Sequence, residues 1–287
     1  MVEKGMVMKM NSLPLKYVVK GKYSIKGKIG ESDFSNVYMA GYNGKKYAVK
    51  ECFPAQLVIR DDKYKVFTNK YNKYFEMVKE SFRREAEILE MFNSENIVGL
   101  KDISEENGTF YLILEYCSGK TLKEYIQKES LEKSKLMEIF STIMEAVSEI
   151  HEKGIVHRDI KPSNIIVDYE GNIKVIDFTS AIKSGEKNGK YVKLTEGYSP
   201  LEMYSTKSVN DVRTDIYSLS ALLYFMVNRI KPMDSLKRFY YPELLYEDIV
   251  SENIKIFIGK GRSQERSDRY VNMEEMKKEF EKLGLKE

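Results

Sequence analysis

The chain has 287 residues, 42% hydrophobic and 32% charged, a composition typical of a folded globular protein with a sizeable core. Its 47 basic and 44 acidic side chains give a net charge of only +3, so neither nucleic acid nor an anionic membrane is expected as the main partner. The two cysteines, Cys52 and Cys117, are too few for a disulfide framework or a four-ligand metal site. A reducing cytoplasmic location is therefore the simplest expectation.

Residues 1–16 are expected to form a leader outside the fold, and lysines interrupt its apolar residues, which argues against a signal peptide. The most apolar stretch, from Leu219 to Val227, is far shorter than the ~20 residues that cross a bilayer. We therefore expect no membrane segment in this chain.

The first third of the chain is predicted to be rich in strands. Short strand-like runs broken by glycines fill residues 23–50, and residues 47–52 (YAVKEC) are the clearest strand. A helix is predicted over about 74–92, because apolar residues there recur in steps of three and four. Glu85 falls on the face of this helix that should be buried, and a buried carboxylate needs a partner.

The remainder is predicted to be mainly helical. Residues 110–117 are predicted to form a buried strand, and Thr121 with Glu124 forms a capping box that opens a short helix. Later elements are a helix over about 134–153 ended by Gly154, short strands and loops over 155–178, a buried helix over 215–227, and a last amphipathic helix marked by Met273, Met276, Phe280 and Leu283. This order favours an α+β fold of two lobes, with ligands bound in a cleft between them.

The strongest chemical signal is the stretch 157–164 (HRDIKPSN), followed by the pair at 177–178 (DF). Phosphoryl transfer needs a carboxylate that orients the attacking hydroxyl, ligands for magnesium, and cations that position phosphates. That set is offered by Asp159, Lys161, Asn164 and Asp177. Magnesium prefers oxygen ligands, which the Asn164 amide and the Asp177 carboxylate provide.

These motifs resemble those of the protein kinase family, and the resemblance covers about residues 20–283. It implies a protein kinase-like fold over 17–287, with a small β-rich N-lobe with one main helix (about 17–117) and a larger helical C-lobe (about 118–287). By resemblance, Asp159 is the catalytic base, and Asn164 and Asp177 hold the metal. In the family, a lysine at the place of Lys161 contacts the transferred phosphate and accompanies serine/threonine specificity.

The nucleotide-binding residues are also implied by the resemblance. Residues 47–50 (YAVK) resemble the family's V-A-I-K, which places Ala48 in the nucleotide site and Lys50 at the α- and β-phosphates. The partner of Lys50 would be Glu85. Glu87 is the alternative, but it falls off the apolar face of the helix.

Residues 29–38 resemble the glycine-rich loop G-x-G-x-x-G-x-V that covers the phosphates, although only the first glycine is kept. Serines replace the other two, and a left-handed backbone at a serine would cost energy. The nucleotide contacts expected from this loop are Ile29, Gly30, Ser32, Ser35 and Val37.

Residues 114–117 resemble the hinge that joins the two lobes. The family binds adenine there through backbone groups, which makes the Glu115 carbonyl and the Cys117 N–H the candidates. Leu114 would be the gatekeeper.

Residues 195–202 (TEGYSPLE) resemble the end of the activation segment. By resemblance, Glu202 pairs with Arg269, Asp215 braces the catalytic loop, and Thr195 lines the substrate site. Arg158 could receive a loop phosphate; the acceptors considered are Ser180, Ser184, Thr195 and Ser199, of which Ser184 is our choice.

Thr179 stands where the family has a glycine after the Asp-Phe pair. Threonine is stiff at χ1, and positive φ is costly for it. We therefore expect the metal-competent orientation of Asp177 and Phe178 to dominate.

Residues 50–62 (KECFPAQLVIRDD) further resemble bacterial serine/threonine kinases. The expected function is transfer of the γ-phosphate of ATP, with Mg²⁺ as cofactor, to serine or threonine of a protein substrate, with autophosphorylation. The alternatives are a pseudokinase or nucleotide-binding scaffold, a small-molecule kinase of the aminoglycoside type, and a pure interaction module. The sequence predicts no oligomeric state.

Overall fold

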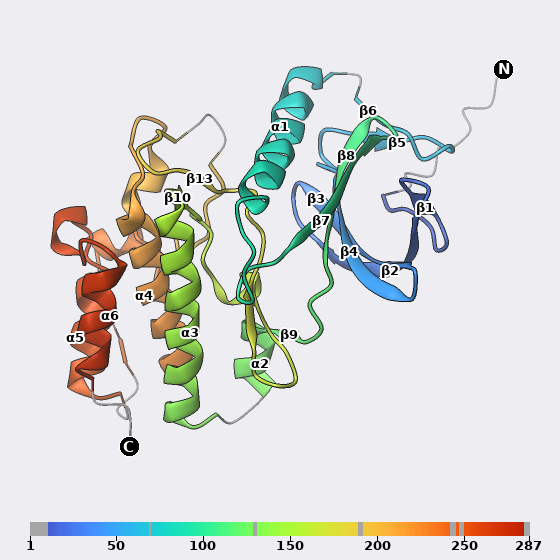
Figure 1. Cartoon of the computed structure of the whole chain (residues 1–287). Helices are drawn as coiled ribbons and strands as arrows, with labels where there is room; N and C mark the ends of the chain where they lie inside the picture. The colour runs from blue at the N-terminus through green and yellow to red at the C-terminus, as the bar shows by residue number, and fades with distance from the viewer. Residues whose placement is uncertain are drawn as a thin grey trace. The chain divides into compact units, whose positions relative to one another are not determined.

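The structure, a computed structural model, describes residues 11–68, 70–128, 131–188, 192–241, 245–246 and 250–283. The chain divides into two compact units, both drawn in Figure 1. The first unit runs to Asn93 and adds Val98–Cys117, and the second comprises Ser94–Ile97 and the chain from Ser118 onward. The first is built on a sheet and the second mainly on helices, so the predicted two-lobed α+β fold is confirmed.

The first unit contains a six-stranded antiparallel sheet in the order β1-β2-β3-β4-β8-β7. Asn43-Gly44 and Asn107-Gly108 close two of its hairpins, and all four residues have positive φ. Such a pair suits a type I′ turn, whose twist matches that of the strands, and asparagine and glycine tolerate the conformation best. The strands are β1 (Val18–Val19), β2 (Tyr23–Glu31), β3 (Ser35–Tyr42), β4 (Lys45–Cys52), β7 (Leu100–Glu106) and β8 (Thr109–Glu115), with a separate pair β5 (Ile59–Arg60) and β6 (Val66–Phe67).

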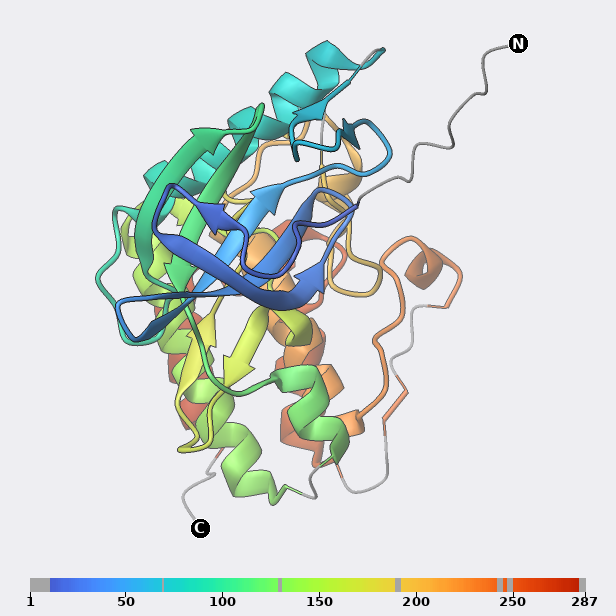
Figure 2. The same cartoon turned by 90° about the vertical axis from the view of Figure 1, so that its right-hand side faces the viewer.

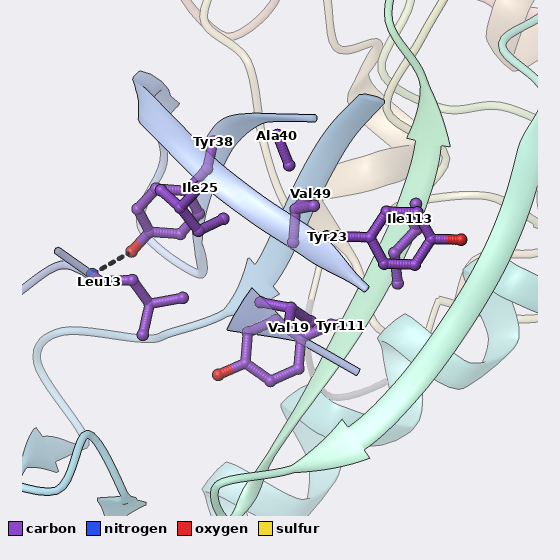
Figure 3. Packing of buried hydrophobic residues seen from close by; sticks show 9 residues of the cluster. All are labelled: Leu13, Val19, Tyr23, Ile25, Tyr38, Ala40, Val49, Tyr111 and Ile113. Carbon is purple, nitrogen blue, oxygen red and sulfur yellow. Dashed lines mark hydrogen bonds between the residues drawn. The ribbon is translucent and has the colours of Figure 1, made fainter. Parts of the chain in front are cut away.

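A cluster of buried apolar side chains packs on this sheet, as Figure 3 shows from close by. Leu13 is one of its members, and the Leu13 N–H donates to the Tyr38 hydroxyl at 3.0 Å. Leu13 lies within the predicted leader, whose residues 1–10 are outside the described residues. Burying a leucine side chain stabilises a fold by about 1.5–3 kcal/mol, so the packed part of the chain reaches back at least to Leu13. The other members are Val19, Tyr23, Ile25, Tyr38, Ala40, Val49, Tyr111 and Ile113.

Helix α1 (Asn72–Leu89) packs against β8, and Figure 2 shows it beside the curved strands of the first unit. Its buried face includes Phe75, Phe82 and Glu85, in agreement with the predicted periodicity. The helix ends three residues before the predicted end at Phe92. The last residues form tighter turns instead, in which the Phe92 N–H donates to the Leu89 carbonyl at 3.2 Å.

The second unit is organised around its helices, of which α3 contacts α4 and α6. They are α2 (Leu122–Lys128), α3 (Lys133–Glu152), α4 (Val212–Asn228), α5 (Glu252–Gly261) and α6 (Met273–Glu281). The capping box that opens α2 is confirmed, because the Thr121 N–H donates to Glu124 Oε2 at 3.0 Å and the Glu124 N–H donates to Thr121 Oγ1 at 3.2 Å. Gly154, at φ +70°, ends α3 as predicted.

The helices differ from the prediction in two places, and the first difference has a simple cause. Helix α4 begins three residues before the predicted Asp215, because the Asp211 carboxylate caps it by accepting the Arg213 N–H at 2.9 Å. Helix α5 was not predicted, and it contacts α4.

Short strands hold the loops of the second unit that matter for chemistry. They form one sheet in the order β12-β11-β9 and one pair β10-β13. The loop 157–164 leaves β10, and the pair 177–178 lies between β12 and β13. The strands are β9 (Lys120–Thr121), β10 (Ile155–Val156), β11 (Ile165–Val167), β12 (Ile173–Val175) and β13 (Ile182–Lys183).

A buried ion pair ties the segment after β4 to the sheet of the first unit. Arg60 Nη2 lies 2.7 Å from Glu51 Oε2, and both side chains are 0% exposed. The hydroxyls of Tyr38 and Tyr111 donate to the same carboxylate, each at 2.9 Å. The buried Glu51 carboxylate is therefore compensated by Arg60, which supplies the only positive charge among these three partners.

We expect Arg60→Ala to lower the free energy of unfolding by about 3–5 kcal/mol, because it leaves a buried carboxylate without its cation. Urea denaturation followed by circular dichroism measures this. The control is Lys63→Ala, an exposed lysine of the same segment, which should change stability by no more than about 0.5 kcal/mol. Equal stability of both variants would show that the ion pair contributes nothing.

Candidate active site

The loop that carries Asp159 is held by a buried carboxylate of α4. Asp215 accepts the N–H groups of His157 and Arg158, both at 2.7 Å, and His151 Nε2 lies 2.9 Å from Asp215 Oδ2. Burial alone would raise the pKa of Asp215, but these partners lower it, so the carboxylate is charged. Its predicted bracing role is confirmed. Arg158 takes a φ of 64°, an unfavourable value for arginine that the two hydrogen bonds stabilise.

The Asp159 carboxylate is the centre of a cluster of donors, and Asp159 is 3% exposed. Thr195 Oγ1 donates to Asp159 Oδ1 at 2.7 Å. Lys161 Nζ and Asn164 Nδ2 each donate to Asp159 Oδ2 at 2.9 Å. The predicted residues 159, 161 and 164 are thus brought together with the threonine of the activation segment. A carboxylate held in place by three donors, one of them a lysine, suits a group that orients a hydroxyl and takes its proton.

Asp177 follows β12 with a φ of 64°. Its Oδ1 accepts the Thr179 hydroxyl at 2.6 Å. Phe178 is 1% exposed and packs edge-on against His157, with ring centroids 4.6 Å apart. The positive φ therefore falls on Asp177 and not on Thr179, whose hydroxyl instead fixes the carboxylate. Which orientation of Asp177 and Phe178 dominates is not decided by this geometry, so the effect expected of Thr179 stays a prediction.

Lys193 was not predicted, and it links the two aspartates. Its Nζ lies 3.1 Å from Asp159 Oδ2 and 3.3 Å from Asp177 Oδ2. Burial alone would lower the pKa of Lys193, but the two carboxylates raise it above its ordinary value, so the side chain stays a cation. The contacts span 34 and 16 residues of chain, and no motif contains this lysine. The sequence offered one indirect hint of such a lysine: Asp159 and Asp177, if they lie close together, need a nearby positive charge.

The first unit contributes a second buried ion pair. Lys50 Nζ of β4 lies 2.7 and 2.8 Å from the two oxygens of Glu85 of α1. The Lys50 and Glu85 side chains are 7% and 0% exposed. The structure thus brings together the lysine and the glutamate that the sequence paired, whereas Glu87 is exposed.

The loop resembling the glycine-rich motif is the hairpin of β2 and β3. Gly30 pairs with Val37 across it, and Ile29 is 50% exposed. The Ser32 and Ser35 hydroxyls lie 2.9 Å apart, and the Ser32 N–H donates to the Ser35 carbonyl at 2.8 Å. Neither serine has a positive φ, so replacing the glycines costs no backbone strain here.

The predicted hinge, residues 114–117, begins in the last two residues of β8 and continues just after that strand. Leu114 is buried and pairs with Ala48 of β4. The Glu115 N–H donates to the Gly99 carbonyl at 2.8 Å, which fixes the backbone before Cys117. Cys117 is half-buried.

Two arginines bind described residues of the activation segment (residues 177–202), on either side of positions 189–191, which lie outside the described residues. Arg269 forms a bidentate pair with Glu202, at 2.7 and 3.0 Å, as predicted. Arg158, the expected receiver of a loop phosphate, donates to the Ser180 carbonyl at 2.6 Å and to the Asn188 side-chain oxygen at 2.8 Å. The side chain of Asn188 in turn donates to the carbonyls of Glu202 and Ser205.

The candidate phosphorylation sites differ in accessibility. Ser180 and Ser199 are 7% and 1% exposed, which disfavours them as acceptors. Ser184 is exposed, and modification there stays a prediction.

Comparison with known proteins identifies the family. The protein kinase domain family matches residues 23–282, so the chain belongs to the protein kinase family. The chain is 31% identical over 221 residues to serine/threonine-protein kinase PrkC of Bacillus subtilis (strain 168), covering 75% of this chain and 32% of that protein. It is 30% identical over 243 residues to CBL-interacting protein kinase 21 of Oryza sativa subsp. japonica, covering 82% and 42%. The relatives thus include a bacterial serine/threonine kinase, as the resemblance implied.

A solved structure, PpkA-294 in its apo form, superposes with a TM-score of 0.81 at 25% identity and covers 94% of this chain and 99% of that one. This likeness confirms the protein kinase-like fold. The chain spans less than half the length of the two curated relatives above.

Two further observations concern the described part of the chain alone. None of its helices is long and apolar enough to cross a membrane. It also contains no group of three or more His, Cys, Asp or Glu side chains placed to hold a metal ion.

Because Lys50 and Glu85 neutralise each other in a buried place, we expect them to act as a unit. If Lys50 holds the phosphates as the resemblance implies, Lys50→Ala, Glu85→Ala and the double variant should each lower phosphate transfer by at least about 100-fold, since misplacing such a group costs about that much. Initial rates with labelled ATP measure the loss. Lys45→Ala, an exposed lysine of the same strand, is the control. Losses that multiply in the double variant would contradict the pairing.

Proposed function

We propose that this chain is an ATP-dependent serine/threonine protein kinase that transfers the γ-phosphate of ATP to hydroxyls of protein substrates and of itself. The observation that carries the proposal is the Asp159 carboxylate, fixed by Lys161, Asn164 and Thr195 at 2.7–2.9 Å. Family membership supports the reaction class. The names of its relatives support serine/threonine specificity.

In the proposed reaction, Asp159 orients the acceptor hydroxyl and accepts its proton. The hydroxyl oxygen forms a bond to the γ-phosphorus of ATP, and the bond from that phosphorus to the leaving ADP oxygen breaks. Lys161, held beside Asp159, offsets the negative charge on the transferred group. Thr195 lines the place of the acceptor. In the other unit, Lys50 is the proposed ligand of the α- and β-phosphates, oriented by Glu85.

For the rest of the nucleotide, we propose the same contacts that the resemblance to the family implies. The β2–β3 hairpin would cover the phosphates, and backbone groups of Glu115 and Cys117 would hold adenine. The contacts assigned to this role are Ile29, Gly30, Ser32, Ser35, Val37, Ala48 and Leu114.

The donor set of the second unit fits magnesium. Asn164 uses its amide nitrogen for Asp159, which leaves its amide oxygen as the ligand atom, and the Asp177 carboxylate is 21% exposed. Magnesium is usually held by one or two protein oxygens together with substrate phosphates, so the lack of a larger acidic group in the described residues agrees with this ion. When bound, Mg²⁺ would neutralise phosphate charge that develops during transfer.

A pseudokinase is the second candidate, favoured by the missing glycines of the hairpin and by Thr179. The charged residues expected of a working kinase are nevertheless all present. Lys50 pairs with Glu85, and Asp159 and Asp177 both contact Lys193. The cytoplasmic location and the lack of a nucleic-acid partner expected from composition stay predictions.

We expect Asp159→Asn to lower phosphate transfer to below a few per cent of the wild-type rate while ATP binding is retained, because the carboxylate orients the hydroxyl and does not hold the nucleotide. Labelled ATP with a generic protein substrate measures transfer, and calorimetry measures ATP binding. Glu170→Gln, an exposed carboxylate between β11 and β12, is the control.

The labelled product of the same experiment should contain phosphoserine or phosphothreonine. A wild-type chain that binds ATP without transfer would establish the pseudokinase. Label found mainly on tyrosine would refute the proposed specificity.

Lys193 neutralises the carboxylates that would face magnesium, so it should compete with the ion. We expect Lys193→Gln to tighten binding of Mg²⁺, measured by calorimetry in the presence of ADP, by about tenfold, the equivalent of about 1.4 kcal/mol. Lys183→Gln, which changes an exposed lysine of β13, should leave the affinity unchanged. Unchanged or weaker Mg²⁺ binding in Lys193→Gln would contradict the competition.

A further inference from the structure

A pocket of about 400 Å³ lies within the second unit, and its wall adjoins the proposed transfer centre. Lys161 and Thr195 line the pocket and also contact Asp159 directly, at 2.8 and 2.7 Å. A hydroxyl presented to Asp159 therefore lies close to the wall of the pocket. An extended chain advances about 3.3–3.6 Å per residue, so side chains within a few residues of the acceptor can enter.

The pocket has an excess of positive charge. Its lining includes the cations Lys123, Lys161, Arg229 and Lys231, and only one carboxylate, Glu196. Glu196 is already committed, because Lys231 and Lys237 both donate to it. Lys123 of α2, in contrast, makes no hydrogen bond or ion pair with any residue that the structure describes, and its ammonium group can meet an incoming anion.

The backbone at Arg229 points to a use for its side chain. Arg229 ends α4 in the left-handed conformation, at φ 58°, and its N–H donates to the Phe225 carbonyl at 2.8 Å. Glycine is the residue best suited to this position, and a side chain there costs about 1 kcal/mol. The arginine reaches across to α2, where it donates to the Ile126 carbonyl at 3.2 Å. The guanidinium is thereby fixed on the pocket wall, which it lines.

The simpler interpretation is that these are ordinary solvated lysines. Three observations favour a binding site. The first is a half-open hollow of about 400 Å³. The second is that α2, the loop after Asp159 and the end of α4 all supply cations to it. The third is the strained backbone of Arg229. A long nucleic acid is disfavoured because the chain as a whole has a net charge of only +3.

We propose that this pocket binds acidic side chains of the protein substrate, so that the kinase prefers serine or threonine flanked by aspartate or glutamate. The inference rests on the proposed function, because it uses Asp159 as the place of the acceptor. Lys123 and Arg229 supply the attraction, and Lys161 and Thr195 connect the pocket to the reacting hydroxyl. The attraction is electrostatic, and the pocket is half open to solvent. Binding of an acidic peptide should therefore weaken as the salt concentration rises.

The test uses the full chain and synthetic peptides with one serine, in which the flanking residues are acidic, neutral or basic. We expect kcat/KM for the acidic peptide to exceed that for the neutral one by about tenfold, mostly through KM, since each exposed ion pair contributes only a few-fold. Lys123→Glu should lower this ratio about fivefold and raise the ratio for the basic peptide. Lys128→Glu, on the same helix but outside the pocket, should leave both ratios unchanged.

Binding of a fluorescent acidic peptide, followed by anisotropy without ATP, gives a second measure that does not need turnover. Weaker binding to Lys123→Glu than to Lys128→Glu supports the pocket. Equal binding to both variants overturns the proposed pocket. Phosphate transfer to all peptides without an acidic preference also overturns the pocket, but it leaves the proposed function standing. If neither peptide phosphorylation nor autophosphorylation is observed, the proposed function fails. The anisotropy comparison alone then decides whether the pocket binds acidic peptides.

Discussion

The chemistry of the second unit depends on the hydrogen bonds that the buried Asp215 accepts from the N–H groups of His157 and Arg158. These hydrogen bonds hold Arg158 at a positive φ. The turn in the backbone at Arg158 sets the position of the next residue, Asp159. A left-handed arginine costs about 1–2 kcal/mol, and two charge-assisted hydrogen bonds can offset that. Because Asp215 belongs to α4, the most deeply buried helix, the loop takes its position from the core.

Charge balance determines how the remaining groups are arranged. Each carboxylate of the site lies against a cation: Glu85 against Lys50, and Asp159 and Asp177 against Lys193. Such pairs place a positive charge beside each carboxylate in a largely buried setting. The Lys50–Glu85 pair in the first unit is almost fully buried. The contacts of Lys193 are partly exposed and are the ones that an incoming metal ion would exchange.

Neutral groups bind Arg158 in the described part of the activation segment, where the family can use a phosphate. Arg158 donates to the amide of Asn188, which itself donates to two carbonyls near the end of the segment. Glu202 and Arg269 fix that end. An unmodified chain therefore already holds Thr195 against Asp159, and the basic pocket beside Thr195 is formed without any modification.

From local patterns and motifs alone, the fold class and the family could be predicted, and so could most of the groups that we propose to carry the chemistry. Motif spacing suffices for Asp159, Asn164 and Asp177, because they lie on one short stretch, and helical periodicity places Glu85 on a buried face. Local signals also gave the capping box at Thr121, the end of α3 at Gly154 and, by resemblance, the partner of Glu202. Tertiary structure alone decided what depends on residues far apart in the chain. The link of Lys193 to two aspartates, the burial of Leu13 and the cations around the pocket come from separate elements, and no local pattern records which charges their packing brings together.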